Sequence, residues 1–205
     1  MHPQYRQAVR SSDTVALIGF ENAFVLTRDA WFARHLEISR DTIFQVTEKL
    51  TDSVFRRALQ KHFTQLSVFP DSLEKTFIDE SVKLSDHIFL KIKVPGQGQK
   101  LSADSLSPPF LLIIHEFIIG TDLLRENYFD YTLAQQESET RRNPDNLSLI
   151  MTYTLWDNFK QRALLSSAVE VQLSILGEPK LDDLASVTVN AVQTLLRELT
   201  GEVAR

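Results

Sequence analysis

The stretch that decides the fold is Leu147–Ile175, which reads LSLIMTYTLWDNFKQRALLSSAVEVQLSI. Apolar and polar residues alternate along its first part up to Leu155, and again along its second part from Leu165 onwards. A period of two is typical of strands, because successive side chains point to opposite faces. Between the two parts, Asp157–Lys160 (DNFK) has residue types that favour a turn. The stretch therefore predicts a β-hairpin, and Gly177 follows its end.

Four further strands are predicted upstream of this hairpin. Thr14–Phe20 (TVALIGF) is apolar on both faces, which is typical of a strand covered on both sides. Phe63–Phe69 is a short strand that Pro70 stops, since proline cannot continue a ladder of hydrogen bonds. Asp86–Val94 (DHIFLKIKV) alternates and has one largely wet face. Phe110–Ile119 (FLLIIHEFII) is too apolar for an edge strand.

Helical periodicity appears in three places. Asp41–His62 has apolar residues three or four apart on one stripe, which predicts a long amphipathic helix with Asp41 as its N-cap. The stripe consists of Ile43, Val46, Leu50, Val54, Ala58 and Leu59. Asp71–Leu84 has the spacing of a short helix. A final helix begins at Asp182 or Asp183 and ends at Gly201, because glycine is favoured just after a helix.

The order of these elements predicts the class α+β. Helices separated from a run of antiparallel strands indicate one mixed or antiparallel sheet, with the long helix and the C-terminal helix packed on it. No repeat or linker divides the chain. We therefore expect a flexible N-terminal segment over 1–13 and a single domain over 14–200.

Composition excludes several classes of protein. The 205 residues contain no cysteine, so disulfides, zinc–thiolate sites and iron–sulfur clusters are absent. The formal net charge is −5, without the basic excess of a typical nucleic-acid binder, so no nucleic-acid partner is expected. No apolar run approaches the roughly 20 residues needed to cross a bilayer. The opening residues also lack the apolar core of a secretory signal.

Candidate chemistry is sparse. His115-Glu116 sits inside a strand pattern, so the two side chains are expected on opposite faces, and His87 and Asp122 lie at strand ends. These four residues could line the pocket of a cytoplasmic α+β enzyme. The alternative is that His115 is an ordinary buried histidine and Glu116 a carboxylate on a solvent-facing side of the strand. No nucleotide, hydrolase, kinase or metal-binding motif is present. We therefore expect no cofactor, no metal and no catalytic residue.

Aromatic residues give the best sequence support for a binding protein. Some fall in segments that otherwise resemble loops, including the polar excursion 122–146, and exposed aromatics are favoured anchors at protein interfaces. The alternative is that these segments fold back and bury the rings. The predicted partner-binding residues are Phe24, Trp31, Phe32, Tyr128, Phe129 and Tyr131.

The order of elements, with Thr14–Phe20, the long helix, Phe110–Asp122 and the stretch from Leu147 to Val171, resembles that of small envelope lipoproteins. The group comprises curli-secretion-channel-like lipoproteins, penicillin-binding-protein activators and auxiliary lipoproteins of ABC-type transporters. Asp157 matches the aspartate of their late hairpin, although Asn158 and Phe159 replace the usual glycine, and their lipidated N-terminal cysteine is not in this sequence.

The resemblance implies a non-enzymatic periplasmic protein, associated with the outer membrane, that binds protein partners in an envelope assembly or transport machine. A lipid anchor outside this sequence and a homo-oligomer are both compatible with it. A cytoplasmic location is the alternative.

Overall fold

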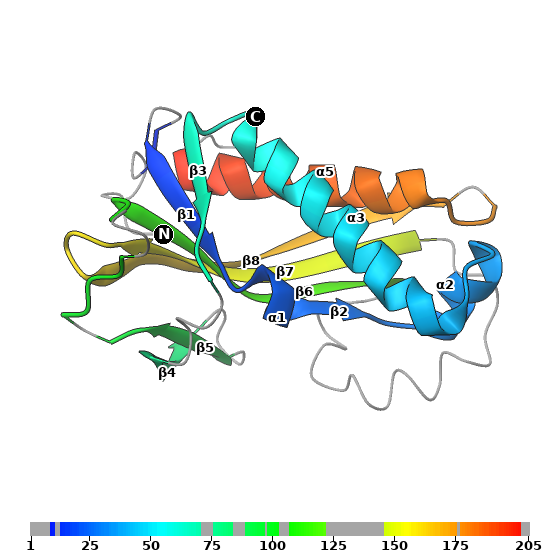
Figure 1. Cartoon of the computed structure of the whole chain (residues 1–205), viewed down its shortest axis with the longest axis horizontal. Helices are drawn as coiled ribbons and strands as arrows, with labels where there is room; N and C mark the ends of the chain where they lie inside the picture. The colour runs from blue at the N-terminus through cyan, green and yellow to red at the C-terminus, as the bar shows by residue number, and fades with distance from the viewer. Residues whose placement is uncertain are drawn as a thin grey trace.

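The computed structural model describes residues 9–10, 13–70, 76–83, 89–96, 98–102, 107–121, 146–175 and 177–201. Its six-stranded main sheet is mixed, since four strands run parallel and two form an antiparallel hairpin that continues from them (Figure 1). The strand order is β3 (Gln65–Val68), β1 (Thr14–Ile18), β6 (Phe110–Thr121), β7 (Asn146–Asp157) and β8 (Arg162–Ser174). The predicted hairpin is confirmed, and β6 is central as its apolar sequence predicts.

A one-turn helix interrupts the strand that runs beside β6. β1 pairs with the first residues of β6, the chain then forms α1 (Phe20–Ala23), and β2 (Phe24–Leu26) pairs with β6 further along. Gly19 precedes α1 with φ 91°, a conformation that side chains with a Cβ rarely adopt. The backbone at this place therefore requires a glycine. The α1 interruption leaves the middle of β6 without strand pairing on this side.

Two long helices cover one face of the main sheet, α3 (Arg40–Gln60) and α5 (Leu181–Thr200), while α2 (Asp29–His35) lies at the start of α3 (Figure 1). Tyr153 of β7 donates a 2.7 Å hydrogen bond to the Glu198 carboxylate of α5, beside the apolar packing. This arrangement confirms the predicted α+β class, as a single domain with the C-terminal helix on the sheet. Among the helices of the described ranges, none has the length and apolarity to cross a membrane.

Both long helices differ from prediction in detail. Ser39 rather than Asp41 caps α3, because its hydroxyl accepts a hydrogen bond from the Asp41 N–H. Asp183 is not the N-cap of α5 but lies in its first turn, where its carboxylate accepts a 2.7 Å hydrogen bond from the Lys180 N–H. The fully buried row of α3 has strict spacing of four and contains two threonines, whereas Val46, Leu50, Val54 and Ala58 are only half-buried. The row is Ile43, Thr47, Thr51, Phe55 and Leu59.

A two-stranded sheet lies against the other face, formed by β4 (Phe77–Lys83) and β5 (Phe89–Pro95). The predicted helix over Asp71–Leu84 is therefore wrong over Phe77–Lys83, and 71–75 and 84 lie outside the described residues. Pairing with β5 overrides the local helical spacing, because seven residues of β4 face seven of β5 in register. Behind this small sheet a second apolar cluster forms, with Phe69, Ile92 and Trp156 among its members.

Candidate functional site

A β-bulge places His115 and Glu116 on the same face of β6. The pairing of β6 with β7 shifts register between Ile114 and Glu116, so His115 is an extra residue. The His115 ring then lies 2.8 Å from the Thr154 hydroxyl, and Thr152 donates a 3.1 Å hydrogen bond to the Glu116 carboxylate. Thr152 and Thr154 share one face of β7. The expectation of opposite faces is therefore wrong, because it assumed an uninterrupted strand.

The bulge lies opposite the α1 interruption, and a cavity of about 270 Å³ forms between them. Its lining combines a carboxylate, an imidazole and two lysines of β5 with backbone of the interrupted strand, and includes Gly19, Asn22, Lys91, Lys93, His115 and Glu116. No group of three potential metal-ligating side chains occurs in the part of the chain that the structure describes. The cavity can offer hydrogen bonds of both kinds and positive charge to a small polar ligand.

His115 is held in its neutral form at neutral pH. Burial lowers its pKa from 6.5 to about 4, since desolvation disfavours the charged imidazolium. Its Nε2 hydrogen-bonds to Thr154, whose hydroxyl also lies 2.8 Å from that of Ser166 on β8. A general base is most efficient with a pKa near the working pH. At neutral pH this histidine is better suited to hydrogen bonding than to proton transfer.

The lowered pKa predicts acid sensitivity. Above pH 6.5 His115 is neutral in both the folded and the unfolded chain, whereas between pH 6.5 and about 4 the unfolded chain takes up the proton first. The free energy of unfolding should therefore fall by ~2 kcal/mol over this window, a value reduced from the full shift for partial exposure. Urea titrations at a series of pH values measure it.

His115→Gln is the matched control, because glutamine keeps a polar group beside Thr154 and does not titrate. The stability of this variant should fall less steeply across the same window, by about the contribution assigned to His115. Parallel curves for the two proteins would contradict the assignment. Carboxylates elsewhere affect both proteins equally, so only the difference between the curves is informative.

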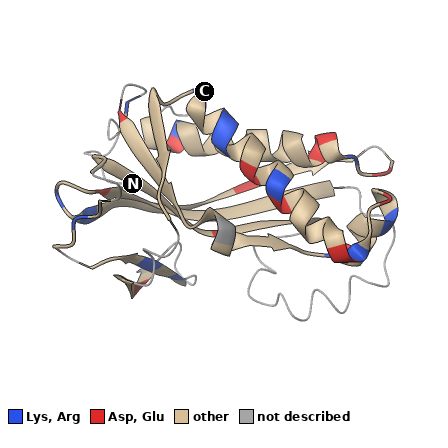
Figure 2. Cartoon of the chain, viewed as in Figure 1, with Lys and Arg blue, Asp and Glu red and all other residues tan. Residues whose placement is uncertain are grey.

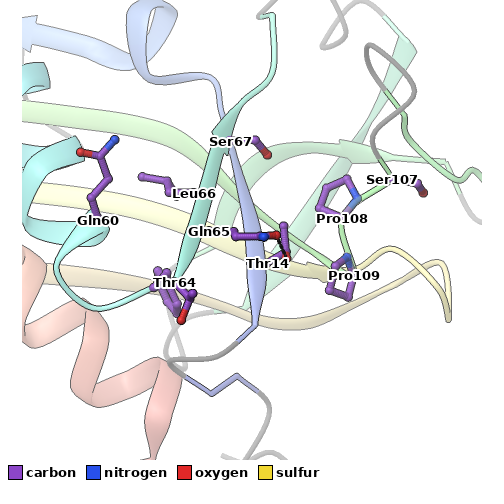
Figure 3. Close-up of a pocket in the computed structure, with 10 residues that line it drawn as sticks. Thr14, Gln60, Thr64, Gln65, Leu66, Ser67, Ser107, Pro108 and Pro109 are labelled. Carbon is purple, nitrogen blue, oxygen red and sulfur yellow. Dashed lines mark hydrogen bonds between the residues drawn. The ribbon is translucent and has the colours of Figure 1, made fainter.

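A second, larger cavity of about 690 Å³ lies at the amino ends of the parallel strands β1 and β3 and just before β6 (Figure 3). Phe63, Leu66, Pro108 and Pro109 supply its apolar lining. The polar lining consists of hydroxyls and amides, from Thr14, Gln60, Thr64, Gln65, Ser67 and Ser107. Thr14 donates a 2.8 Å hydrogen bond to the Gln65 side chain across the two strands. None of these residues is charged, so the cavity suits a neutral ligand with polar main-chain or hydroxyl groups.

The free edge of β3 runs along this second cavity. The Phe69 N–H donates to the Leu17 carbonyl of β1 at 2.9 Å, and main-chain groups alternate in direction along a strand. The N–H and C=O groups of Leu66 and Val68 therefore point away from β1. No strand in the described ranges pairs with this side of β3. Val68 is also 46% exposed, so its surroundings are open to a partner.

The predicted partner-binding aromatics are distributed differently from expectation. Phe24 and Phe32 are 4% and 0% exposed and belong to the main core, so the prediction that they form an exposed contact surface is wrong. The cause is that Phe24 begins β2 and its ring lies 6.3 Å from that of Phe117, while α2 turns Phe32 inward. Trp31 is half-buried, with its ring 4.5 Å from that of His35.

The other predicted site residues lie outside the described residues: Tyr128, Phe129, Tyr131, His87 and Asp122. Of the alternative pocket, only His115 and Glu116 can be placed, and they share one cavity. Sequence reasoning missed Lys91, Lys93 and the edge of β3. One signal was present, since two adjacent polar residues inside the apolar run FLLIIHEFII indicate a break in strand alternation.

Comparison with known proteins identifies no family. No protein-family description and no curated protein matches the chain. Among solved structures, the chain is similar to the PelC dodecamer from Paraburkholderia phytofirmans, with 11% identity and a TM-score of 0.42, over 94% of this chain and 91% of that one. It is also similar to a neuraminyllactose-binding hemagglutinin homolog from Helicobacter pylori, with 12% identity and a TM-score of 0.34, over 100% and 90%. At such scores the likeness carries no functional argument.

Proposed function

We propose that this chain is a non-enzymatic binding subunit whose protein partner adds an extended segment to the free edge of β3. The outward-facing main-chain groups of Leu66 and Val68 carry the proposal. An extended peptide that pairs with an open strand gains main-chain hydrogen bonds, and adjacent pockets select its side chains.

The cavity beside β3 supports a peptide of particular chemistry. Its lining has hydroxyl, amide, proline and aromatic groups and no charge, so it favours neutral side chains on the partner segment. β3 has only four residues, and the N–H of the following residue, Phe69, donates a hydrogen bond to β1. The partner segment is therefore short, and side-chain contacts in the cavity must supplement the few main-chain bonds.

The proposal that the chain is not an enzyme is supported by the state of His115. The ring is neutral at neutral pH and its Nε2 is already hydrogen-bonded. The second candidate function, an enzyme acting at this pocket, is favoured by the shared cavity of His115 and Glu116. Substrate turnover that disappears in Glu116→Gln, with folding unchanged, would support the enzyme and contradict our proposal.

We place this subunit in the periplasm at the outer membrane, as part of an envelope assembly or transport machine. The support is the sequence resemblance to small envelope lipoproteins. Fractionation of the source cells tests the location, since the protein should sediment with outer membranes and carry lipid at its processed N-terminus. Recovery in the cytoplasmic fraction without lipid would favour the alternative location.

The β3 edge can be tested with Val68→Pro. Proline removes the outward N–H and obstructs strand pairing, yet it is tolerated at an edge position whose N–H has no partner in the sheet. Partner affinity should fall about tenfold or more, as expected when a main-chain bond and its neighbours are lost. The partner is first captured from native cells and identified, and its purified form is then titrated against both proteins by calorimetry.

Two matched variants separate backbone from side-chain effects. Val68→Ala removes the exposed side chain but keeps the N–H, so it should bind within a few-fold of the native affinity. Ser67→Pro removes a bond to β1 and should lower the free energy of unfolding by at least ~1 kcal/mol. Unchanged affinity in Val68→Pro, with a native melting temperature, would refute binding at this edge.

A further inference from the structure

The turn between β7 and β8 presents the most exposed large apolar side chain of the described residues. Phe159 is 61% exposed, well above the other exposed phenylalanine, Phe44, at 42%. The turn lies at the end of the sheet, away from α2 (Figure 1). A single exposed phenylalanine is common on protein surfaces, so this ring points to a function only together with its rigid position and the basic side chains near it.

The structure holds this turn rigidly. The Asp157 carboxylate accepts the N–H groups of Phe159 and Lys160 at 3.1 and 2.8 Å. Between them Asn158 is fully buried, and its side chain bonds to both main-chain groups of Leu101 at 2.8 Å and to the Pro108 carbonyl at 2.9 Å. Because Asn158 is fixed inward, Phe159 is fixed outward.

Three basic residues lie close to Phe159, one in contact with the ring and two nearby in the sequence. The Lys100 ammonium lies 4.9 Å from the centre of the Phe159 ring, and Lys160 and Arg162 follow Phe159 by one and three residues in the sequence. Among the described residues of this turn, the carboxylate is that of Asp157, which forms a 3.4 Å ion pair with Lys160. The chain as a whole has a net charge of −5, so this basic turn runs against the overall charge (Figure 2).

We propose that this turn docks on an anionic lipid surface, with Phe159 entering the headgroup layer and Lys100, Lys160 and Arg162 contacting lipid phosphates. Apolar and basic side chains together are the combination that binds such interfaces. A lipid surface fits better than a protein because the turn presents one ring at the end of the sheet, and its Asp157 and Asn158 hydrogen-bonding groups are engaged internally. The proposal does not depend on the β3 edge.

The expected binding is weak and reversible. One ring and three cations give an attraction comparable to that of a single fatty-acyl chain, which does not anchor a protein stably by itself. The turn would therefore orient a protein that is held at the membrane by another contact. Its function would be to set which face of the sheet is turned towards the bilayer.

The test is sedimentation of the full chain with phosphatidylcholine vesicles, and with vesicles of phosphatidylcholine and phosphatidylglycerol in equal parts. The native chain should bind the anionic vesicles and not the neutral ones, and raising the salt from about 0.1 M to about 0.5 M should release it. Phe159→Ala should weaken binding about tenfold, and each cation replaced by glutamine about fivefold.

Phe44→Ala is the matched control, since it removes another exposed phenylalanine and should leave vesicle binding unchanged. In Phe159→Trp, the added fluorescence should shift to shorter wavelength with anionic vesicles as the ring leaves water. The proposal would be overturned if the native chain did not bind anionic vesicles, if Phe159→Ala bound them equally, or if Phe159→Trp showed no shift. Equally Phe159-dependent binding to soluble polyglutamate would overturn it in favour of an acidic protein surface.

Discussion

Replacing Phe117 by alanine is expected to lower the free energy of unfolding by about 3–5 kcal/mol, the range for emptying a large packed site. Phe117 follows the bulge on β6, is 0% exposed, and lies where the main sheet, α1 and α3 meet. Its ring centre lies 4.9 Å from that of Phe20 and 5.5 Å from that of Phe55. The cavity left by the mutation cannot collapse easily, because these neighbours come from different elements.

Urea titration measures this change, with Phe159→Ala as the control. Residue 159 is mostly exposed, so its truncation should change stability by no more than about 0.5 kcal/mol. A loss below about 1 kcal/mol for Phe117→Ala would show that the aromatic cluster repacks or is not formed as described. The mutation should also disturb the His115 cavity, because Phe117 lies only two residues further along β6.

The second large effect is expected for Asn158→Ala, at about 2–4 kcal/mol. The side chain of Asn158 satisfies the buried N–H and C=O of Leu101 and the carbonyl of Pro108. Removing it leaves these groups without partners away from water, which costs more than the net value of the bonds themselves. The loop segments 98–102 and 107–109 should then separate from the hairpin.

Hydrogen exchange provides the specific readout for Asn158→Ala. The amide of Leu101 donates to the Asn158 side chain in the native chain, so its exchange should accelerate in the variant more than that of amides in β7. Unchanged protection at Leu101, or a stability loss under about 1 kcal/mol, would contradict the assigned network. Asn158→Asp offers a second check, because it keeps the acceptor for Leu101 but places a charge against two carbonyls.

The elements that could be predicted from the sequence are those whose signals are local. The β7–β8 hairpin follows from period-two alternation and a polar turn, and α5 ends at Gly201 in the expected left-handed conformation. The buried row of α3 was predicted in part, because threonine was counted as polar. Thr47 is fully buried, and its hydroxyl donates to the Ile43 carbonyl one turn earlier, so it needs no outside partner.

The candidate site could not be predicted because it depends on features that come from distant parts of the chain. The β6 bulge turns His115 towards Thr154, which lies on another strand, and the cavity closes only where Gly19 interrupts the neighbouring strand. Similarly, β4 is a strand because β5 pairs with it. Phe24 and Phe32 resembled exposed loop residues because the short elements β2 and α2 have no clear periodicity of their own.

The mixture of near and distant strand pairing has a consequence for the order of folding. β7 and β8 are joined by a tight turn, so their ladder can close within microseconds of collapse, as hairpins do. The pairing of Val15 with Phe110 instead closes a loop of about half the domain, which carries a larger entropic penalty and slows assembly. The histidine cavity requires this late contact, whereas the Phe159 turn needs only the hairpin and its adjoining loop. A chain emerging from the ribosome would thus complete its N-terminal pairings only after β6 has been synthesised, and until then the apolar strand β1 would be a target for chaperones.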